Sequence, residues 1–333
     1  MKKLQGEMIK WGKLLFERHL ISGWGGNLSC RVGENEFLIT GRHAPLGFLT
    51  AADLVRIDGA GKPLKPDQLA SSETPLHLAV YAATGTQAII HVHPPITLAF
   101  SLTHDDFVPV SFEEKYTIGE VPIIAQNTPT VTKPEKFAEE LKYRSVAIIK
   151  GHGTVAIGKN FQEAFLLTDL LEEAVRCRFF TERQSELNVS IPDQIEKQKG
   201  LAKPQTGKSY VLFSKEHMSA LIERANHDSQ FRSHGEETGL STSLTLLLEE
   251  KDAAWTVRFD SGQITQVDSG DNGEFLISGP EEWWSAVFRA RIDPFLATQQ
   301  GKLKLKRGEL AQLARWYKPF QRAFSLWQSI SIQ

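Results

Sequence analysis

Two histidines stand one residue apart in the stretch IIHVHPP, residues 89–95. Residues i and i+2 of a β-strand point to the same face, so a strand here would direct the imidazoles of His91 and His93 toward one point. Such a pair can offer two nitrogen ligands to a metal, or it can be two ordinary packed histidines. Without further ligands, packing is the more common outcome.

A third histidine and a carboxylate extend the candidate site. His152 lies between two glycines in KGHG, where the backbone can approach a ligand closely. Three neutral imidazoles with one open position are typical of a catalytic zinc ion, which acts as a Lewis acid. Glu73, in the stretch SSETPLH, is the candidate base, although these letters also describe a helix cap with an acidic first turn. We expect His77, one turn further on, to support that helix.

Short strands must position these residues. Clusters of aliphatic and β-branched residues bounded by Gly, Pro and Asp alternate with helical patterns over roughly the first 187 residues, which predicts a mixed α/β domain. The predicted strands span 36–40, 53–58, 88–93, 121–125 and 145–149, and the main predicted helices span 71–85, 132–144 and 161–187.

The rest of the chain differs in kind. Residues 188–207 are polar and contain two prolines, so we predict a linker between a domain of residues 1–187 and one of residues 208–333. The second domain places four strand patterns before its helical patterns, an α+β order, and ends in a helix predicted at 308–327. Five of the seven tryptophans lie in this part.

Composition excludes several classes of function. The 333 residues carry a formal net charge of −2, without the basic field that attracts nucleic acid. No apolar run reaches the roughly 18 residues of a membrane span, and the charged first helix does not match a signal peptide. The two cysteines are too few for a disulfide framework. We therefore expect a cytoplasmic protein with small soluble partners.

Five motifs in one order resemble the class II aldolase/adducin family. They are GGNLSCR, FLIT, SSETPLH, IIHVHPP and KGHG, spread over about residues 5 to 185. The resemblance implies an αβα sandwich with a central, largely antiparallel sheet. It also implies that His91, His93 and His152 bind Zn²⁺, or another divalent metal, and that Glu73 is the acid/base carboxylate.

The same resemblance implies an activity. The expected reaction is cleavage or formation of a C–C bond in a small phosphorylated ketose through a metal-stabilised enediolate, in a homotetramer. A sugar-phosphate epimerase or dehydratase would use the same zinc site. A non-catalytic, adducin-like module is the alternative from another class, although adducins lack the histidine set.

The phosphate pocket departs from the family pattern. Asn27, Ser71 and Ser72 match residues that bind phosphate in the family, but Arg42 stands where a small residue is expected. Arg42 could bind phosphate or carboxylate bidentately, or be a surface arginine. Gln126 occupies the place of a proton-donating tyrosine, which leaves Tyr116, Glu113 or Glu114 as candidate proton donors.

The second domain resembles sterol-carrier-protein-2-like domains. The resemblance rests on FLISGPEEWWSAVFRARIDPF and the GKLKLKRGEL segment that follows, and implies a sheet with a tunnel for a lipid or another apolar ligand. The alternative is that Trp283, Trp284 and Trp316 fill a core or a subunit contact.

Overall fold

The computed structural model describes residues 1–126, 128, 130–186, 209–251 and 253–333. The chain divides into two compact units, Met1–Ile195 and Glu196–Gln333, and each is described by itself. The linker predicted at 188–207 lies outside the described residues, so the predicted domain limits stay a prediction.

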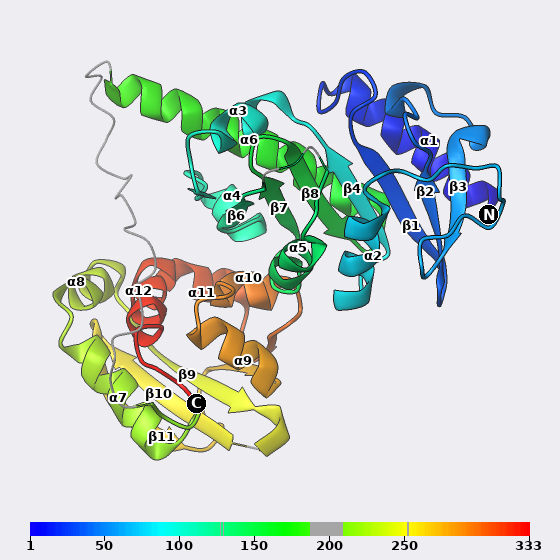
Figure 1. Ribbon diagram of the computed structural model, residues 1–333. Coiled ribbons are helices and arrows are strands. Elements are labelled where there is room, and N and C mark those ends of the chain that lie inside the picture. The colour runs from blue at the N-terminus through cyan, green and yellow to red at the C-terminus, as the bar shows by residue number, and fades with distance from the viewer. Residues whose placement is uncertain (127, 129, 187–208, 252) are drawn as a thin grey trace. The chain divides into compact units, whose positions relative to one another are not determined.

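An eight-stranded sheet forms the centre of the first unit (Figure 1). Its strand order is β3-β2-β1-β4-β8-β7-β6-β5, and β6 pairs with β7 in parallel while the other pairs are antiparallel. The strands are β1 (Asn27–Gly33), β2 (Glu36–Thr40), β3 (Leu54–Asp58), β4 (Ala88–Val92), β5 (Asp106–Phe107), β6 (Val121–Ile124), β7 (Val146–Ile149) and β8 (Gly153–Gly158). The predicted largely antiparallel sheet is confirmed.

Helices cover both faces of this sheet, which confirms the αβα sandwich. One face packs on α1 (Lys2–Glu17), α3 (Pro95–Ser101) and α6 (Phe161–Glu186), the other on α2 (Thr74–Ala83) and α5 (Pro134–Leu141). The remaining helices of this unit are α4 (Phe112–Thr117) and the 3₁₀ turns Leu46–Phe48 and Ala51–Asp53.

The register between β1 and β4 determines which side chains of these strands face α2. Leu28 and Cys30 belong to the core beneath α1 and α6, so the alternating Asn27 and Ser29 point to the opposite face. Asn27 pairs directly with His91 across the β1–β4 ladder. The polar residues of β1 therefore share a face with the first histidine.

A carboxylate from α6 caps the helix that follows the two histidines. The buried Glu172 accepts hydrogen bonds from the backbone N–H groups of Ile96 and Thr97, at 3.0 and 2.9 Å, and from the Thr97 hydroxyl at 2.7 Å. Helix α3 has no side-chain cap of its own. Glu172 thus satisfies two N–H groups that a helix start leaves without intrahelical partners.

We expect Glu172→Ala to lower the free energy of unfolding by about 2–4 kcal/mol, because it leaves buried donors unpaired. Denaturant titration of the whole chain measures this change. Glu173→Ala is the matched control, since the Glu173 side chain is about half exposed and pairs with Arg176 at the surface. We expect a change below about 0.5 kcal/mol. Equal effects of the two substitutions would contradict the capping role.

The second unit is an α+β structure around a five-stranded sheet of order β11-β10-β9-β12-β13. Strands β9 and β12 pair in parallel and the other pairs are antiparallel. The strands are β9 (Ser241–Leu248), β10 (Ala253–Asp260), β11 (Gln263–Ser269), β12 (Phe275–Gly279) and β13 (Lys304–Arg307). The helices are α7 (Lys215–Asn226), α8 (Ser229–Thr238), α9 (Glu281–Phe288), α10 (Pro294–Gln299), α11 (Leu310–Leu313) and α12 (Tyr317–Trp327), with 3₁₀ turns Glu249–Lys251 and Ala314–Trp316.

Two predictions for this unit were wrong. Strands do not come first, because α7 and α8 precede β9, each with a side-chain N-cap, Ser214 and Asp228. The last helix is not continuous from 308 to 327 but breaks into α11, a 3₁₀ turn and α12. Pro319 explains the break, since its ring clashes with the carbonyl four residues earlier and it lacks an N–H group.

The tryptophans of the second unit contribute to its core. Trp284 and Trp327 are fully buried and both lie against Phe288. Their indole N–H groups donate to the carbonyls of Leu247 and Leu221. This arrangement supports the core-filling alternative for Trp284, and an apolar ligand stays a prediction.

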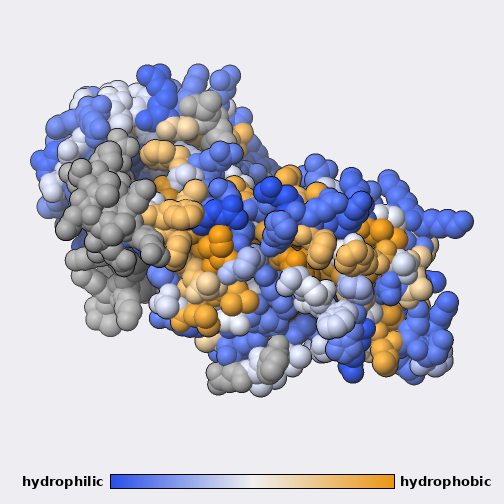
Figure 2. Space-filling view, turned by 90° about the horizontal axis from the view of Figure 1, so that it is seen from above, coloured by the Kyte–Doolittle hydropathy of each residue, from blue (hydrophilic) through white to orange (hydrophobic). Residues whose placement is uncertain are grey.

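Surface features bear on partners. Among the described residues, none of the helices combines the length and apolar content of a membrane span. Apolar side chains nevertheless interrupt the polar surface on the face drawn in Figure 2. Large exposed hydrophobic residues of the first unit include Trp24, Phe48, Leu69, Phe112 and Phe180.

Candidate metal centre and active-site cleft

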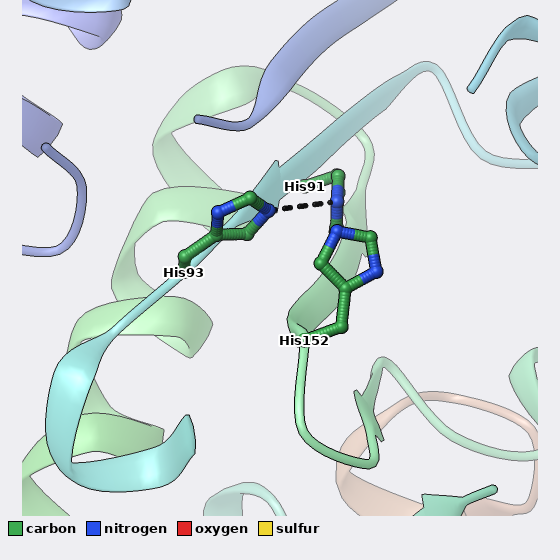
Figure 3. A group of neighbouring side chains, drawn as sticks. All are labelled: His91, His93 and His152. Carbon is green, nitrogen blue, oxygen red and sulfur yellow. Dashed lines mark hydrogen bonds between the residues drawn. The ribbon is translucent and has the colours of Figure 1, made fainter. Parts of the chain in front are cut away.

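Three imidazoles converge at one end of the sheet of the first unit (Figure 3). His91 is on β4, His93 follows the end of that strand, and His152 lies in the turn between β7 and β8. One nitrogen from each ring lies within 4.8 Å of the others. The ring centroids are 4.7 to 5.0 Å apart. The structure thus brings together the three histidines that were predicted from the sequence as metal ligands.

Burial keeps these rings neutral. It lowers the pKa of His91 well below its ordinary value, with smaller contributions from the neighbouring His93 and His152. Burial also lowers the pKa of His93 to about 4, and lowers the pKa of His152. Metal ligation requires the neutral imidazole, so these environments favour the form that binds a cation.

The hydrogen bonds of His91 leave the correct nitrogen free. Its Nδ1–H donates to the carbonyl of Thr154 at 2.9 Å, so Nε2 carries a lone pair toward the cluster. The Nε2 atoms of His91 and His93 are 3.3 Å apart. Two nitrogens bound at about 2.05 Å to one tetrahedral ion lie about 3.3 Å apart. This donor set therefore fits a divalent metal such as zinc.

Gln126 contacts the third histidine. Its Nε2 lies 3.0 Å from Nδ1 of His152, and its buried Oε1 has no partner among the described residues. If the carboxamide turned by 180°, Oε1 would accept a hydrogen bond from Nδ1–H, which frees Nε2 of His152 for a metal. The orphaned oxygen thus marks Gln126 as a partner suited to a metal-ligating imidazole.

Two glycines provide the space for His93. A Cβ atom on Gly25 would lie 2.7 Å from its Nδ1, and a Cβ atom on Gly153 would lie 2.6 Å from its Cδ2 and 2.3 Å from the carbonyl oxygen of Val92. Any larger residue would displace the ring. The sequence predicted that the glycines around His152 allow a close approach of the backbone to a ligand. In the structure, Gly153 instead leaves room for the ring of His93.

A cleft of about 420 Å³ opens over the three histidines, and Glu73 lines it. Glu73 is buried and its carboxylate accepts a hydrogen bond from the N–H of Val131, at 3.3 and 3.4 Å to its two oxygens. Burial raises the pKa of the Glu73 carboxyl, and the Val131 N–H partly opposes this. A raised pKa brings a carboxyl closer to the range in which general acid–base groups exchange protons.

The predicted anion-binding residues line the same cleft. They are Asn27, Arg42, Ser71 and Ser72. His43, next to Arg42, also lines the cleft and has a left-handed backbone, with φ of 61°. That conformation favours glycine, so an L-residue here is strained. The candidate donors Glu113, Glu114 and Tyr116 do not lie among the described residues of the cleft wall.

His77 has a role that sequence reasoning missed. It was expected to support its helix, but its Nε2 contacts Oδ1 of Asn27 and its Nδ1 contacts Oγ of Ser29. Both contacts reach from α2 to strand β1. The one indication of these contacts in the sequence is that Asn27 and Ser29, two residues apart, lie on the same face of a strand.

Comparisons with known proteins agree with this fold. A profile of the class II aldolase and adducin N-terminal domain matches residues 6–179. An L-fuculose phosphate aldolase of Methanococcus maripaludis is 30% identical over 174 residues, which cover 52% of this chain and 94% of that protein. A 3-oxo-tetronate 4-phosphate decarboxylase of Haemophilus influenzae is 31% identical over 185 residues, 52% of this chain and 85% of its own.

A solved structure extends the likeness to three dimensions. The L-fuculose-1-phosphate aldolase of Thermus thermophilus is similar with a TM-score of 0.53 and 28% identity, over 57% of this chain and 100% of that one. The sandwich fold and the histidine cluster define a protein of the class II aldolase type. The chain belongs to the class II aldolase and adducin family.

Proposed function

We propose that this protein is a metal-dependent lyase that cleaves or forms a C–C bond in a small phosphorylated ketose. The observation that supports this most is the cluster of His91, His93 and His152 within 4.8 Å, under a cleft that also contains Glu73. The three imidazoles would hold a divalent metal, with zinc the best match to the donor set. When bound, the metal would stabilise negative charge on oxygens of the substrate.

The side chains of the cleft take the remaining roles. In the cleavage direction, a proton leaves the hydroxyl that becomes the new carbonyl, the adjacent C–C bond breaks, and the released carbon receives a proton. Glu73 would carry the proton to and from that carbon. Asn27, Ser71 and Ser72 would bind the phosphate, with Arg42 adding a positive charge at the same wall.

One observation favours a second candidate, the decarboxylation of a phosphorylated 3-oxo acid. Arg42 lines the cleft as an exposed guanidinium, which can bind a carboxylate bidentately. The 3-oxo-tetronate 4-phosphate decarboxylase of Haemophilus influenzae matches the same half of the chain. Loss of CO₂ would use the same metal site, because it also places negative charge next to a carbonyl.

Product analysis tests the proposal. Purified protein with its bound metal is offered phosphorylated ketoses, free ketoses, 3-hydroxy acids and a phosphorylated 3-oxo acid. We expect two shorter carbonyl compounds from a ketose phosphate. Release of CO₂ would instead support the decarboxylase, an inverted centre an epimerase, and loss of water a dehydratase. No conversion together with no bound metal would support a non-catalytic, adducin-like module.

Assembly and the second unit belong to the same proposal. We propose a homotetramer in the cytoplasm, with the exposed apolar side chains of the first unit available for subunit contacts. The sterol-carrier-protein-2-like second unit would bind an apolar ligand only if its buried tryptophans leave a tunnel. Light scattering and native mass spectrometry measure the number of subunits and any retained ligand.

A further inference from the structure

A chain of buried hydrogen bonds lies behind the cleft, between β1 and α2. The Tyr81 hydroxyl is 2.8 Å from Oγ of Ser29, which is 2.6 Å from Nδ1 of His77. Nε2 of His77 is 2.5 Å from Oδ1 of Asn27, which lines the cleft. All four residues are buried, but only Asn27 reaches the cleft.

The donors of this series of hydrogen bonds can point in only one direction. Burial lowers the pKa of His77 to about 3, so the ring is neutral and carries a single N–H. If Nδ1 carried that hydrogen, Ser29 would accept it and donate in turn to Tyr81. The Tyr81 hydroxyl hydrogen would then have no acceptor, since Ser29 is its one hydrogen-bond partner among the described residues. An unpaired buried donor is costly, so this direction is excluded.

In the remaining direction the hydrogens of Tyr81, Ser29 and His77 each have an acceptor. Tyr81 donates to Ser29, Ser29 donates to Nδ1 of His77, and the Nε2–H of His77 donates to Oδ1 of Asn27. This arrangement occupies the carbonyl oxygen of the Asn27 carboxamide. Its NH₂ group, which has no partner among the described residues, is therefore available to the cleft.

We infer that His77 is a positioning residue that fixes Asn27 as a hydrogen-bond donor toward an oxyanion of the substrate, and that Ser29 and Tyr81 hold the required tautomer of His77. This inference rests on the proposed function, in which the cleft binds a phosphorylated ketose. Without the His77 donor, the carboxamide can turn and present its oxygen to the anion. A hydrogen bond to a charged group lost in this way lowers affinity about 10- to 100-fold.

Two substitutions separate positioning from packing. His77→Gln keeps an N–H donor near the place of Nε2, whereas His77→Met fills similar volume without a donor. Binding of inorganic phosphate to the metal-loaded protein is measured by calorimetry, and KM and kcat with the ketose phosphate. We expect His77→Met to weaken phosphate binding about 10- to 100-fold and to raise KM more than it lowers kcat. His77→Gln should stay within about threefold of the wild type.

Metal content and fold are measured in both variants and in the wild type. Equal metal content ensures that phosphate bound directly to the metal contributes equally to the affinity of each protein. Equal impairment of His77→Gln and His77→Met, or full phosphate binding in His77→Met, would overturn the inference. If neither variant folds, ¹⁵N NMR of histidine-labelled wild-type protein decides, because it reports the tautomer directly. We expect Nε2–H for His77, and Nδ1–H would overturn the inference.

These readouts are separable from the proposed function. A wild type that binds phosphate but converts no ketose phosphate would refute the lyase proposal and leave the positioning of Asn27 intact. A wild type that turns over substrate but shows the Nδ1–H tautomer would refute the positioning alone. A wild type that does not bind phosphate at all would remove the anion from the role assigned to Asn27.

Discussion

Glu73→Gln is expected to reduce turnover of the ketose phosphate about 10²- to 10⁴-fold, the range that general acid–base catalysis contributes. The carboxamide cannot exchange a proton with the reacting carbon. Its oxygen can still accept the hydrogen bond from Val131 N–H that Glu73 makes, so the surrounding loop keeps its contact. Steady-state kinetics of both proteins measure the change.

The control for this substitution is the metal content of the protein. Because the three histidines are untouched, we expect Glu73→Gln to keep the metal content of the wild type, measured by elemental analysis. Activity within about tenfold of the wild type would remove the carboxylate from its assigned role. Loss of metal in Glu73→Gln would instead show that the carboxylate is itself a ligand.

His93→Ala is expected to abolish stoichiometric metal binding and, with it, measurable turnover. Second-sphere substitutions alone typically cost 10- to 100-fold in metal affinity, so the loss of one of three protein ligands should cost more than about 100-fold. Competition with a chromophoric chelator measures the affinity. Prior dialysis of the wild type against a chelator should give the same inactive state, which added Zn²⁺ reverses.

His227→Ala is the matched control, because this exposed histidine lies at the end of α7 in the other unit. We expect it to retain wild-type metal content and turnover. If His93→Ala also retained both, the histidine cluster would be a packing feature and the lyase proposal would fail.

Local patterns predicted strand β4, which carries His91 and ends just before His93, because a period of two and β-branched residues indicate both the strand and its faces. The resemblance to the class II aldolase/adducin family, rather than a local pattern, implied that His152 and Glu73 would approach it. The cleft brings all four together as expected. The roles assigned to them remain to be tested by the substitutions above.

Contacts between distant elements were not predictable in this way. His77 finds its partners 50 and 48 residues away, and Glu172 reaches Ile96 and Thr97 across 76 and 75 residues. Nothing in the local sequence around these side chains indicates their partners, because tertiary packing selects them. Helices α7 and α8 were missed although Met218, Leu221 and Ala225 have helical spacing in α7 and the caps Ser214 and Asp228 mark the two starts.

Under the proposed function, the pairing of Asn27 with His91 would limit the length of a substrate. Directly opposed residues of an antiparallel ladder have their Cβ atoms about 4.5–5.5 Å apart and on one face. The proposed anion donor and the first candidate metal ligand are therefore held at a separation that hydrogen bonds of the backbone determine. A slip of one residue would place Leu28 opposite His91 and turn Asn27 to the other face. Under the proposed function, strand register rather than a loop would thus select compounds whose charged end and chelating oxygens are only a few bonds apart.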